Sequence, residues 1–76
     1  MIRKSTRKFK KYMVLHNGKW IHFGDTRYQH FKDRTPLKMY SHLDHNDPAR
    51  KRRYYQRHGT TRDKSSAKYW ANLYLW

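Results

Sequence analysis

Four arginines occupy one short stretch of the chain, and their spacing suits the binding of phosphate groups. They are Arg50, Arg52, Arg53 and Arg57. At 100° per residue of an α-helix, three of them fall on one side and Arg52 lies at its edge. Arginine binds phosphate well because its guanidinium group is a planar, weakly hydrated fork of donors. The pattern predicts a helix face that contacts a phosphate backbone, with a solvated charged face as the alternative.

A second group of cations lies at the start of the chain. Residues 1–11 contain no acidic side chain and six basic ones: Arg3, Lys4, Arg7, Lys8, Lys10 and Lys11. We expect residues 1–11 to form a flexible basic arm that contacts phosphate or serves as a nuclear-targeting patch. A solvated tail is the alternative, because every other segment of the chain is basic too.

The charge of the whole chain favours a polyanionic partner. Lys and Arg number 19 against 5 acidic residues, all of them Asp, which gives a net charge of +14. A folded domain with this imbalance repels itself unless counter-ions or a polyanion are near. Nucleic acid is the first candidate, an anionic membrane surface the second and an acidic protein the third. The arginine spacing matches no base-reading code, so we expect binding to be dominated by the backbone and sensitive to salt.

Aromatic residues make up 17% of the chain, which is unlike a disordered basic tail. Exposed rings could stack on unpaired bases. We favour core packing instead, because a domain of 76 residues needs nearly all its large apolar side chains for that purpose. The core residues we expect are Trp20, Tyr40, Leu43, Trp70 and Leu73.

Histidine and aspartate side chains gather around the predicted arginine helix. His42, Asp44, His45 and His58 are of the types that bind metals. Asp44-His45 followed by His58 also faintly resembles the HNH nucleases. In this chain, however, the Asp-His pair precedes a helix and no second catalytic-looking carboxylate follows. We prefer the interpretation that the aspartates cap helices or pair with arginine and that the histidines form local hydrogen bonds. We therefore predict no metal site and no cofactor.

No other enzyme class is supported. The chain has no cysteine, no glutamate and only 3 glycines, which are isolated from one another. These counts leave no thiol nucleophile, no glycine-rich phosphate loop and no glutamate to act as general acid or base. We predict a non-enzymatic protein.

The clearest β signal is Tyr12–Gly24. Two β-prone runs flank Asn17-Gly18, the strongest short hairpin turn. A two-residue turn pairs His16 with Lys19, Leu15 with Trp20, and Val14 with Ile21.

Two helices have clear boundary signals. Asp47 can cap a helix that begins at Pro48, and Gly59 suits its C-terminal cap. Ser65 or Ser66 can cap a second helix over Ala67–Trp76. Two further short helices are weaker predictions: Asp25–Arg34, capped by Asp25, and Leu37–Leu43, capped by Thr35 before Pro36.

Together these elements predict a small α+β domain over residues 12–76, following the arm. An N-terminal β-hairpin would be packed by two or three short helices. Without cysteine the domain has no disulfides, so assembly with a partner would help to stabilise it. The longest apolar runs are far below 18 residues, so we predict no transmembrane helix.

Five blocks in order resemble a family of small basic proteins of unknown function from nucleocytoplasmic large DNA viruses. They are KWIHFGD (Lys19–Asp25), RYQHFKD (Arg27–Asp33), PLKMYSHLDHND (Pro36–Asp47), RRYYQRHG (Arg52–Gly59) and KYWANLYLW (Lys68–Trp76). The resemblance implies a viral protein of the virion, the host nucleus or a cytoplasmic viral factory. It implies no catalytic residues.

The leading hypothesis is therefore a sequence-tolerant nucleic-acid-binding protein, with DNA favoured, that helps to condense or package a viral genome. The alternative is a minor capsid or internal scaffold protein. Its contacts with other virion proteins would come from Trp70, Leu73, Tyr74 and Trp76. A metal-dependent nuclease built on the histidine–aspartate cluster is the remote third hypothesis.

Overall fold

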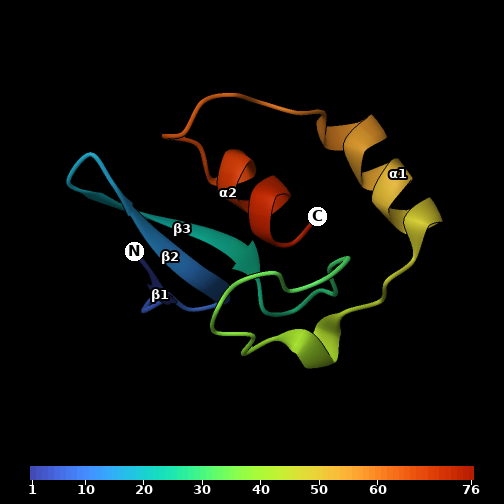
Figure 1. Ribbon diagram of the computed structural model, residues 1–76, viewed down its shortest axis with the longest axis horizontal. Coiled ribbons are helices and arrows are strands. Elements are labelled where there is room, and N and C mark those ends of the chain that lie inside the picture. Colours follow the sequence, from blue (N-terminus) through green and yellow to red (C-terminus); the bar gives the residue numbers. More distant parts are fainter.

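The computed structural model describes all residues, 1–76, and shows an α+β domain (Figure 1). A three-stranded antiparallel sheet in the order β1-β2-β3 forms one layer, and α2 packs over it. α1 lies on the far side of α2 from the sheet. The elements are β1 (Ile2–Lys4), β2 (Lys10–His16), β3 (Lys19–Asp25), the 3₁₀ helix η1 (Ser41–Leu43), α1 (Pro48–His58) and α2 (Ala67–Tyr74).

The β2–β3 hairpin confirms the predicted turn and register. Its pairs include His16 with Lys19, Leu15 with Trp20, and Val14 with Ile21. Both turn residues have positive φ, 51° at Asn17 and 76° at Gly18. Two positive φ angles in succession define the type I′ turn that matches the twist of the strands.

The sheet includes part of the segment that we expected to be an arm. Ile2–Lys4 forms β1 and pairs antiparallel with β2, and Lys10–Lys11 already belongs to β2. The half-buried Ile2 lies opposite Val14, so the strand covers the open edge of β2 with main-chain hydrogen bonds and one apolar side chain. Residues 1–11 are therefore not a separate arm, which corrects that boundary.

The core is small and lies between the sheet and α2. Its buried apolar members are Tyr12, Val14, Phe23 and Leu75. Gly24 in β3 has φ 78°, and a Cβ added there would lie 2.9 Å from Cδ1 of Leu75 and 3.0 Å from Cβ of Lys11. Only glycine fits at this position, because the backbone angle and the close approach both exclude a side chain.

Both well-signalled helices form with the caps that we predicted. The Asp47 side chain accepts a hydrogen bond from Ala49 N, Pro48 is the first helical residue, and Gly59 caps the C-terminus of α1. The Ser66 side chain accepts from Lys68 N at the start of α2, which ends two residues earlier than predicted. Neither helix has the length and apolarity needed to cross a lipid bilayer.

The two weaker helix predictions are wrong. Residues 26–40 form turns and irregular backbone, and only η1 is helical before α1. Asp25 uses its side chain to bind Arg27, and Thr35 Oγ1 accepts from Lys38 N in a tight turn. Local side-chain hydrogen bonds of this kind compete with helix formation, and here they prevail over a short apolar periodicity.

The core prediction is correct only in part. Tyr40, Leu43 and Trp70 are half-buried, whereas Trp20 is 37% exposed and Leu73 is 47% exposed. Trp20 lies on the face of the sheet turned away from α2, and Leu73 lies on the outer side of α2. Tyr74 and Trp76, which were not in the predicted core, pack against it instead.

Candidate nucleic-acid interface

All five aspartates are engaged within the protein. Asp25 pairs with Arg27, Asp44 pairs with His30, and Asp33 binds Tyr12 and Thr35. Asp47 caps α1, and Asp63 accepts from Ser65 N in the connection between the helices. Arg27 is the only Lys or Arg whose side chain forms an ion pair with a carboxylate. The remaining cations are therefore not neutralised by the protein itself.

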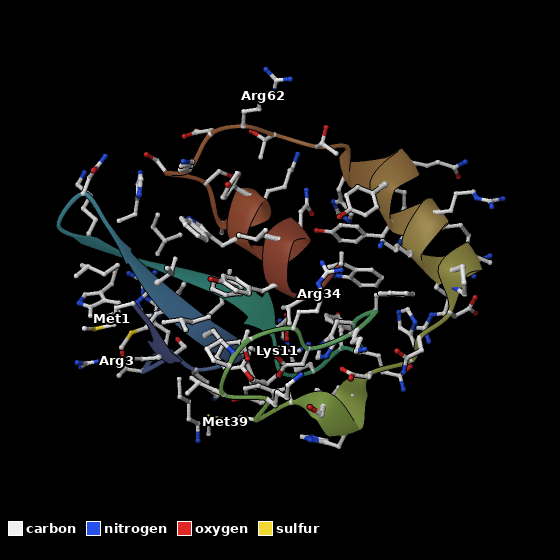
Figure 2. All side chains as sticks on the ribbon, in the orientation of Figure 1. Met1, Arg3, Lys11, Arg34, Met39 and Arg62 are labelled. Carbon is white, nitrogen blue, oxygen red and sulfur yellow. The ribbon has the colours of Figure 1, made fainter.

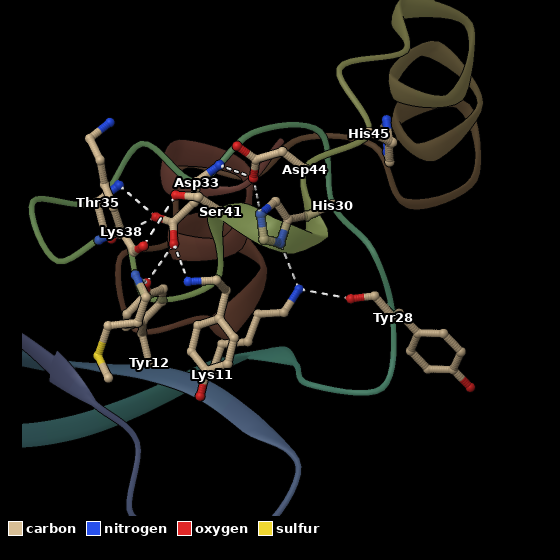
Figure 3. Close-up of polar contacts among 12 residues, drawn as sticks. Lys11, Tyr12, Tyr28, His30, Asp33, Thr35, Lys38, Ser41, Asp44 and His45 are labelled. Atoms are coloured by element: carbon tan, nitrogen blue, oxygen red, sulfur yellow. Dashed lines mark hydrogen bonds and ion pairs between the residues drawn. The ribbon is translucent and has the colours of Figure 1, made fainter.

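One cation is enclosed by a buried polar network, shown in Figure 3. Nζ of Lys11 lies 3.0 Å from the carbonyl oxygen of Tyr28 and 2.7 Å from Nδ1 of His30. Nε2 of His30 in turn contacts Oδ1 of Asp44. Because the Lys11 ammonium can only donate, Nδ1 of His30 must accept, and the ring proton therefore lies on Nε2 facing Asp44.

Electrostatics agrees with this assignment. Burial lowers the pKa of Lys11 to about 8, although Asp25, Asp33 and Asp44 attract its charge. Burial and the neighbouring Lys11 also lower the pKa of His30, despite the opposing hydrogen bond to Asp44. His30 is therefore neutral at pH 7 and relays the interaction between a cation and a carboxylate.

Asp33 is the second centre of this network. Its carboxylate accepts hydrogen bonds from Tyr12 Oη, Thr35 N, Thr35 Oγ1 and Tyr40 N. Burial alone would raise the pKa of Asp33, yet the hydrogen bonds from Thr35, Tyr12 and Tyr40 hold it below its usual value. The network ties β2 to the irregular segment 26–44.

The burial of Lys11 corrects its assignment as a phosphate ligand. Lys11 is 1% exposed and its ammonium already has two acceptors, so it is not open to an incoming anion. Lys11 could not be distinguished in advance, because Lys10 and Lys11 are identical neighbours in a basic segment. The only local signal is the pair Asp33 and Thr35, whose spacing is typical of a side-chain-stabilised turn.

The arginine helix presents its cations largely as predicted. Arg52, Arg53 and Arg57 are exposed, while Arg50 is half-buried and donates from Nη1 to Oε1 of Gln29 at 2.8 Å. The opposite face packs through tyrosines: Tyr54 Oη donates to Oδ1 of Asn72 in α2. α1 is thus held against α2 by aromatic residues and directs most of its guanidinium groups to solvent.

Cations from the two predicted groups meet around one cavity of about 630 Å³. The cavity lies where the end of β3 and the segment after it meet α1 and the end of α2. Its lining includes Lys10, Arg50, Arg57 and His58 together with the aromatic residues Tyr28, Tyr54 and Trp76. The volume lies within the range of roughly 300–1,000 Å³ that is typical of small-molecule sites.

The cavity has a positive character despite one acidic residue in its lining. Asp25 lines it too, but Arg27 Nε and Nη2 bind the two carboxylate oxygens at 3.0 and 2.8 Å. The hydrogen bonds from Arg27 are the main cause that lowers the pKa of Asp25 to about 2. Asp25 therefore keeps its own counter-ion and does not neutralise Lys10, Arg50 or Arg57.

The other predicted phosphate ligands lie around β1, away from this cavity. Arg3, Lys4, Arg7 and Lys8 are all exposed. The guanidinium group of Arg3 lies 5.5 Å from the ring centre of Trp20 on the outer face of the sheet. Figure 2 shows Arg3 near the sheet and Arg62 projecting from the connection between α1 and α2, so the positive charge is spread over several sides of the molecule.

The histidine–aspartate cluster is not assembled as a metal site. No group of three His or Asp side chains is arranged to bind a metal ion. Asp44 is bound to His30 and to Asp33 N, while His45 packs against the rings of Phe31 and Trp76 and lies apart from the network in Figure 3. His42 is exposed beside Tyr40, and His58 lies against Tyr54 in α1.

Comparison with known families is informative about relationship but not about activity. Residues 1–58 match the family of unknown function DUF5754. The chain belongs to this family. The match spans the sheet, the buried network and α1, and it ends before α2. No curated protein and no solved structure matches the chain.

Proposed function

We propose that this protein is a non-enzymatic, sequence-tolerant nucleic-acid-binding protein that contacts mainly the phosphate backbone. The carrying observation is the use of all five aspartates within the fold, with a single ion pair to a surface cation. A net charge of +14 is therefore presented almost entirely to solvent and to partners. A polyanion is the partner that relieves such self-repulsion and gains counter-ion release.

The principal contact surface in this proposal is α1 with Lys10. Exposed arginines on a rigid helix suit phosphate oxygens, and no acidic side chain of α1 interrupts them. Arg3, Lys4, Arg7 and Lys8 around β1 supply additional contacts. Taken with the resemblance to basic proteins of large DNA viruses, the proposal extends to condensing or packaging a viral genome, with DNA as the favoured polymer.

The test is a salt titration of binding to fluorescent duplex and single-stranded DNA. Replacing Arg50, Arg53 and Arg57 with glutamate should abolish retention of DNA without unfolding the domain, as checked by circular dichroism. Loss of three phosphate contacts by neutralisation alone would make the slope of log K against log salt shallower by about 2.7 on duplex.

A matched control changes the same amount of charge elsewhere. Lys19, Lys38 and Lys64 are exposed and lie outside α1. Their replacement by glutamate should weaken binding less than the α1 variant does. Equal losses in the two variants would remove α1 as the principal surface. Wild-type affinity no tighter than about 10⁻⁴ M near physiological salt would overturn the proposed function.

The outer face of the sheet favours a second candidate, a structural protein of the virion. Met1 is 71% exposed, Leu15 40% and Trp20 37%. Exposed apolar side chains on one sheet face suit a protein partner. The segment that we expected to make this contact is mostly engaged within the domain, since Trp70, Tyr74 and Trp76 are half-buried and only Leu73 is largely exposed. This candidate requires the protein to associate through the outer face of the sheet. Light scattering should detect that association, and Trp20→Ser should suppress it.

A further inference from the structure

We infer that the cavity between β3, α1 and α2 binds one unpaired nucleotide of a single strand. Its phosphate would lie between Arg57 and Lys10, and its base would stack on Tyr28. The inference rests on the proposed nucleic-acid binding and deepens it, because it names the form of the polymer and the residues that would distinguish it from a duplex.

The cavity is lined by cations from β2 and α1 that are free to bind phosphate. Arg57 and Lys10 are exposed, line the cavity and form no hydrogen bond or ion pair with another side chain. Arg50 lines it as well and is oriented by Gln29, which leaves its remaining donors available. A bound phosphate would therefore gain two or three charge-assisted hydrogen bonds without breaking an existing ion pair.

The aromatic lining differs in which ring faces are free. Tyr54 and Trp76 stack on each other, with centroids 4.2 Å apart and planes within 3°. The ring centre of His58 lies 4.7 Å from that of Tyr54, and the ring centre of His45 lies 5.2 Å from that of Trp76. These two half-buried rings are therefore already engaged with other rings.

Tyr28 is the most exposed aromatic residue of the lining; the guanidinium group of Arg27 lies 5.8 Å from its ring centre, so a base would stack on the opposite face. Tyr28 is 65% exposed at the cavity, and its main chain is fixed because its carbonyl oxygen accepts from the buried Lys11 ammonium. A base in a duplex has its faces covered by neighbours, so this contact requires an unpaired base. Stacking on an aromatic side chain is tolerant of sequence, since every base has a π-face.

The experiment compares two strands of equal length and charge, an oligothymidylate and a strand of stable abasic (tetrahydrofuran) residues. Wild-type protein should bind the oligothymidylate roughly tenfold more tightly, which is the usual scale of one base–aromatic contact. Tyr28→Ala should lose that preference while binding the abasic strand as before. Tyr28→Phe keeps the ring and should keep the preference.

A charge-matched pair on α1 tests the phosphate. Arg57→Gln and Arg53→Gln remove the same charge from the same helix, but only Arg57 lines the cavity. Arg57→Gln should weaken binding of the oligothymidylate several-fold more than Arg53→Gln does. Thermal unfolding of each variant shows that the difference does not come from stability.

The outcomes distinguish failure of the nucleotide site from failure of the proposed nucleic-acid binding. Equal affinity for the two strands, with Tyr28→Ala unchanged and binding still falling steeply with salt, would overturn the nucleotide site and leave the proposed function standing. Equal losses from Arg57→Gln and Arg53→Gln would also overturn it. Absence of salt-dependent binding to either strand would overturn the proposed function and the nucleotide site together.

Discussion

Lys10 and Lys11 are adjacent in β2, yet they belong to two different regions of the molecule. Both residues line the cavity, but Lys11 is 1% exposed and its ammonium group enters the buried network, whereas the side chain of Lys10 is exposed. The network contains two carboxylates, Asp33 and Asp44, that compensate buried donors. The cavity contains one, Asp25, which is already paired with Arg27.

The difference between the two regions shows how the few acidic residues of the chain are distributed. Buried charges are tolerated only when they are paired and hydrogen-bonded, and two of the five carboxylates, Asp33 and Asp44 of the segment 26–44, accept hydrogen bonds in the buried network. The same placement leaves the cations of the cavity and of α1 uncompensated. The residues that stabilise the fold are therefore different from those to which we assign the proposed binding, and variants should separate the two effects.

The largest expected effect is on the network. Asp33→Ala would deprive several buried donors of their acceptor, including Tyr12 Oη and Tyr40 N. At about 1–3 kcal/mol for each unsatisfied group, the free energy of unfolding should fall by about 3–5 kcal/mol, a large share of the total for a small domain. Urea unfolding followed by tryptophan fluorescence measures it.

Two further variants keep this prediction open to test. Tyr12→Phe removes a single hydroxyl and should cost about 1–2 kcal/mol, so it supplies a value even if Asp33→Ala does not fold. Asp63→Ala is the control, because Asp63 is exposed and its side chain accepts only from the backbone N of Ser65. A loss from Asp63→Ala as large as that from Asp33→Ala would contradict the distinction between the regions.

A smaller effect should appear as a pH dependence that belongs to Lys11. Its pKa is about 8 in the folded protein against an ordinary value of 10.5. The unfolded chain therefore binds more protons between these values, and stability should rise with pH from about 8 toward 10.5, by on the order of 2 kcal/mol. The stability contributed by neutral Lys11 is fully present above the pKa of Lys11 in the unfolded chain. It is lost as the pH falls through the pKa of Lys11 in the folded protein.

Tyrosines set the upper limit of that measurement. Burial raises the pKa of both Tyr12 and Tyr54 to about 12, so their contribution is lost as pH rises from about 10 to 12. Unfolding should therefore be measured from pH 7 to 9.5. Lys11→Met should lack the rise and Lys10→Met should retain it; the same slope in both variants would show that Lys11 is not its source.

The smallest expected effect on stability comes from the capping of α1, the helix that forms one wall of the cavity. Asp47→Ala removes the side-chain cap of α1 and should cost about 1 kcal/mol. Since α1 carries Arg50 and Arg57, hydrogen exchange should accelerate at the start of α1 while β2 remains protected. Asp47→Asn, which preserves a capping oxygen, should restore protection. Uniform acceleration through β2 would mean that the two regions are one cooperative unit.

Local sequence signals predicted the strands and helices but not the tertiary contacts between distant residues. Asn17-Gly18, Asp47-Pro48 and Gly59 each fix the backbone of their own neighbourhood, so the hairpin register and the bounds of α1 followed from sequence. Lys11, His30 and Asp44 are distant in sequence, and no local pattern says that they meet. The segment 26–40 took its shape from that network, which is why the helices predicted there are absent.

The candidate site was predicted in its residue types but not in its location. The arginines of α1 were singled out from their spacing, and Lys10 from the basic segment, yet nothing in the sequence indicated that Lys10 and Arg57 line the same cavity. Tyr28 falls within the helix predicted over Asp25–Arg34, whereas it lies in an irregular segment, exposed at the cavity. Which rings pack and which remain free is decided by partners such as Trp76 and Tyr54, and these contacts exist only in the folded chain.

The uncompensated charge of the domain also sets a stoichiometry. A charge of +14 is matched by the phosphates on about 24 Å of duplex, because duplex DNA carries one negative charge per roughly 1.7 Å of its axis. The molecule measures 36 × 26 × 21 Å. If the protein binds duplex DNA as we propose, the length of DNA that one copy would neutralise is thus close to the width that one copy occupies. Copies standing side by side along a duplex would leave neither bare phosphate nor surplus protein charge between them.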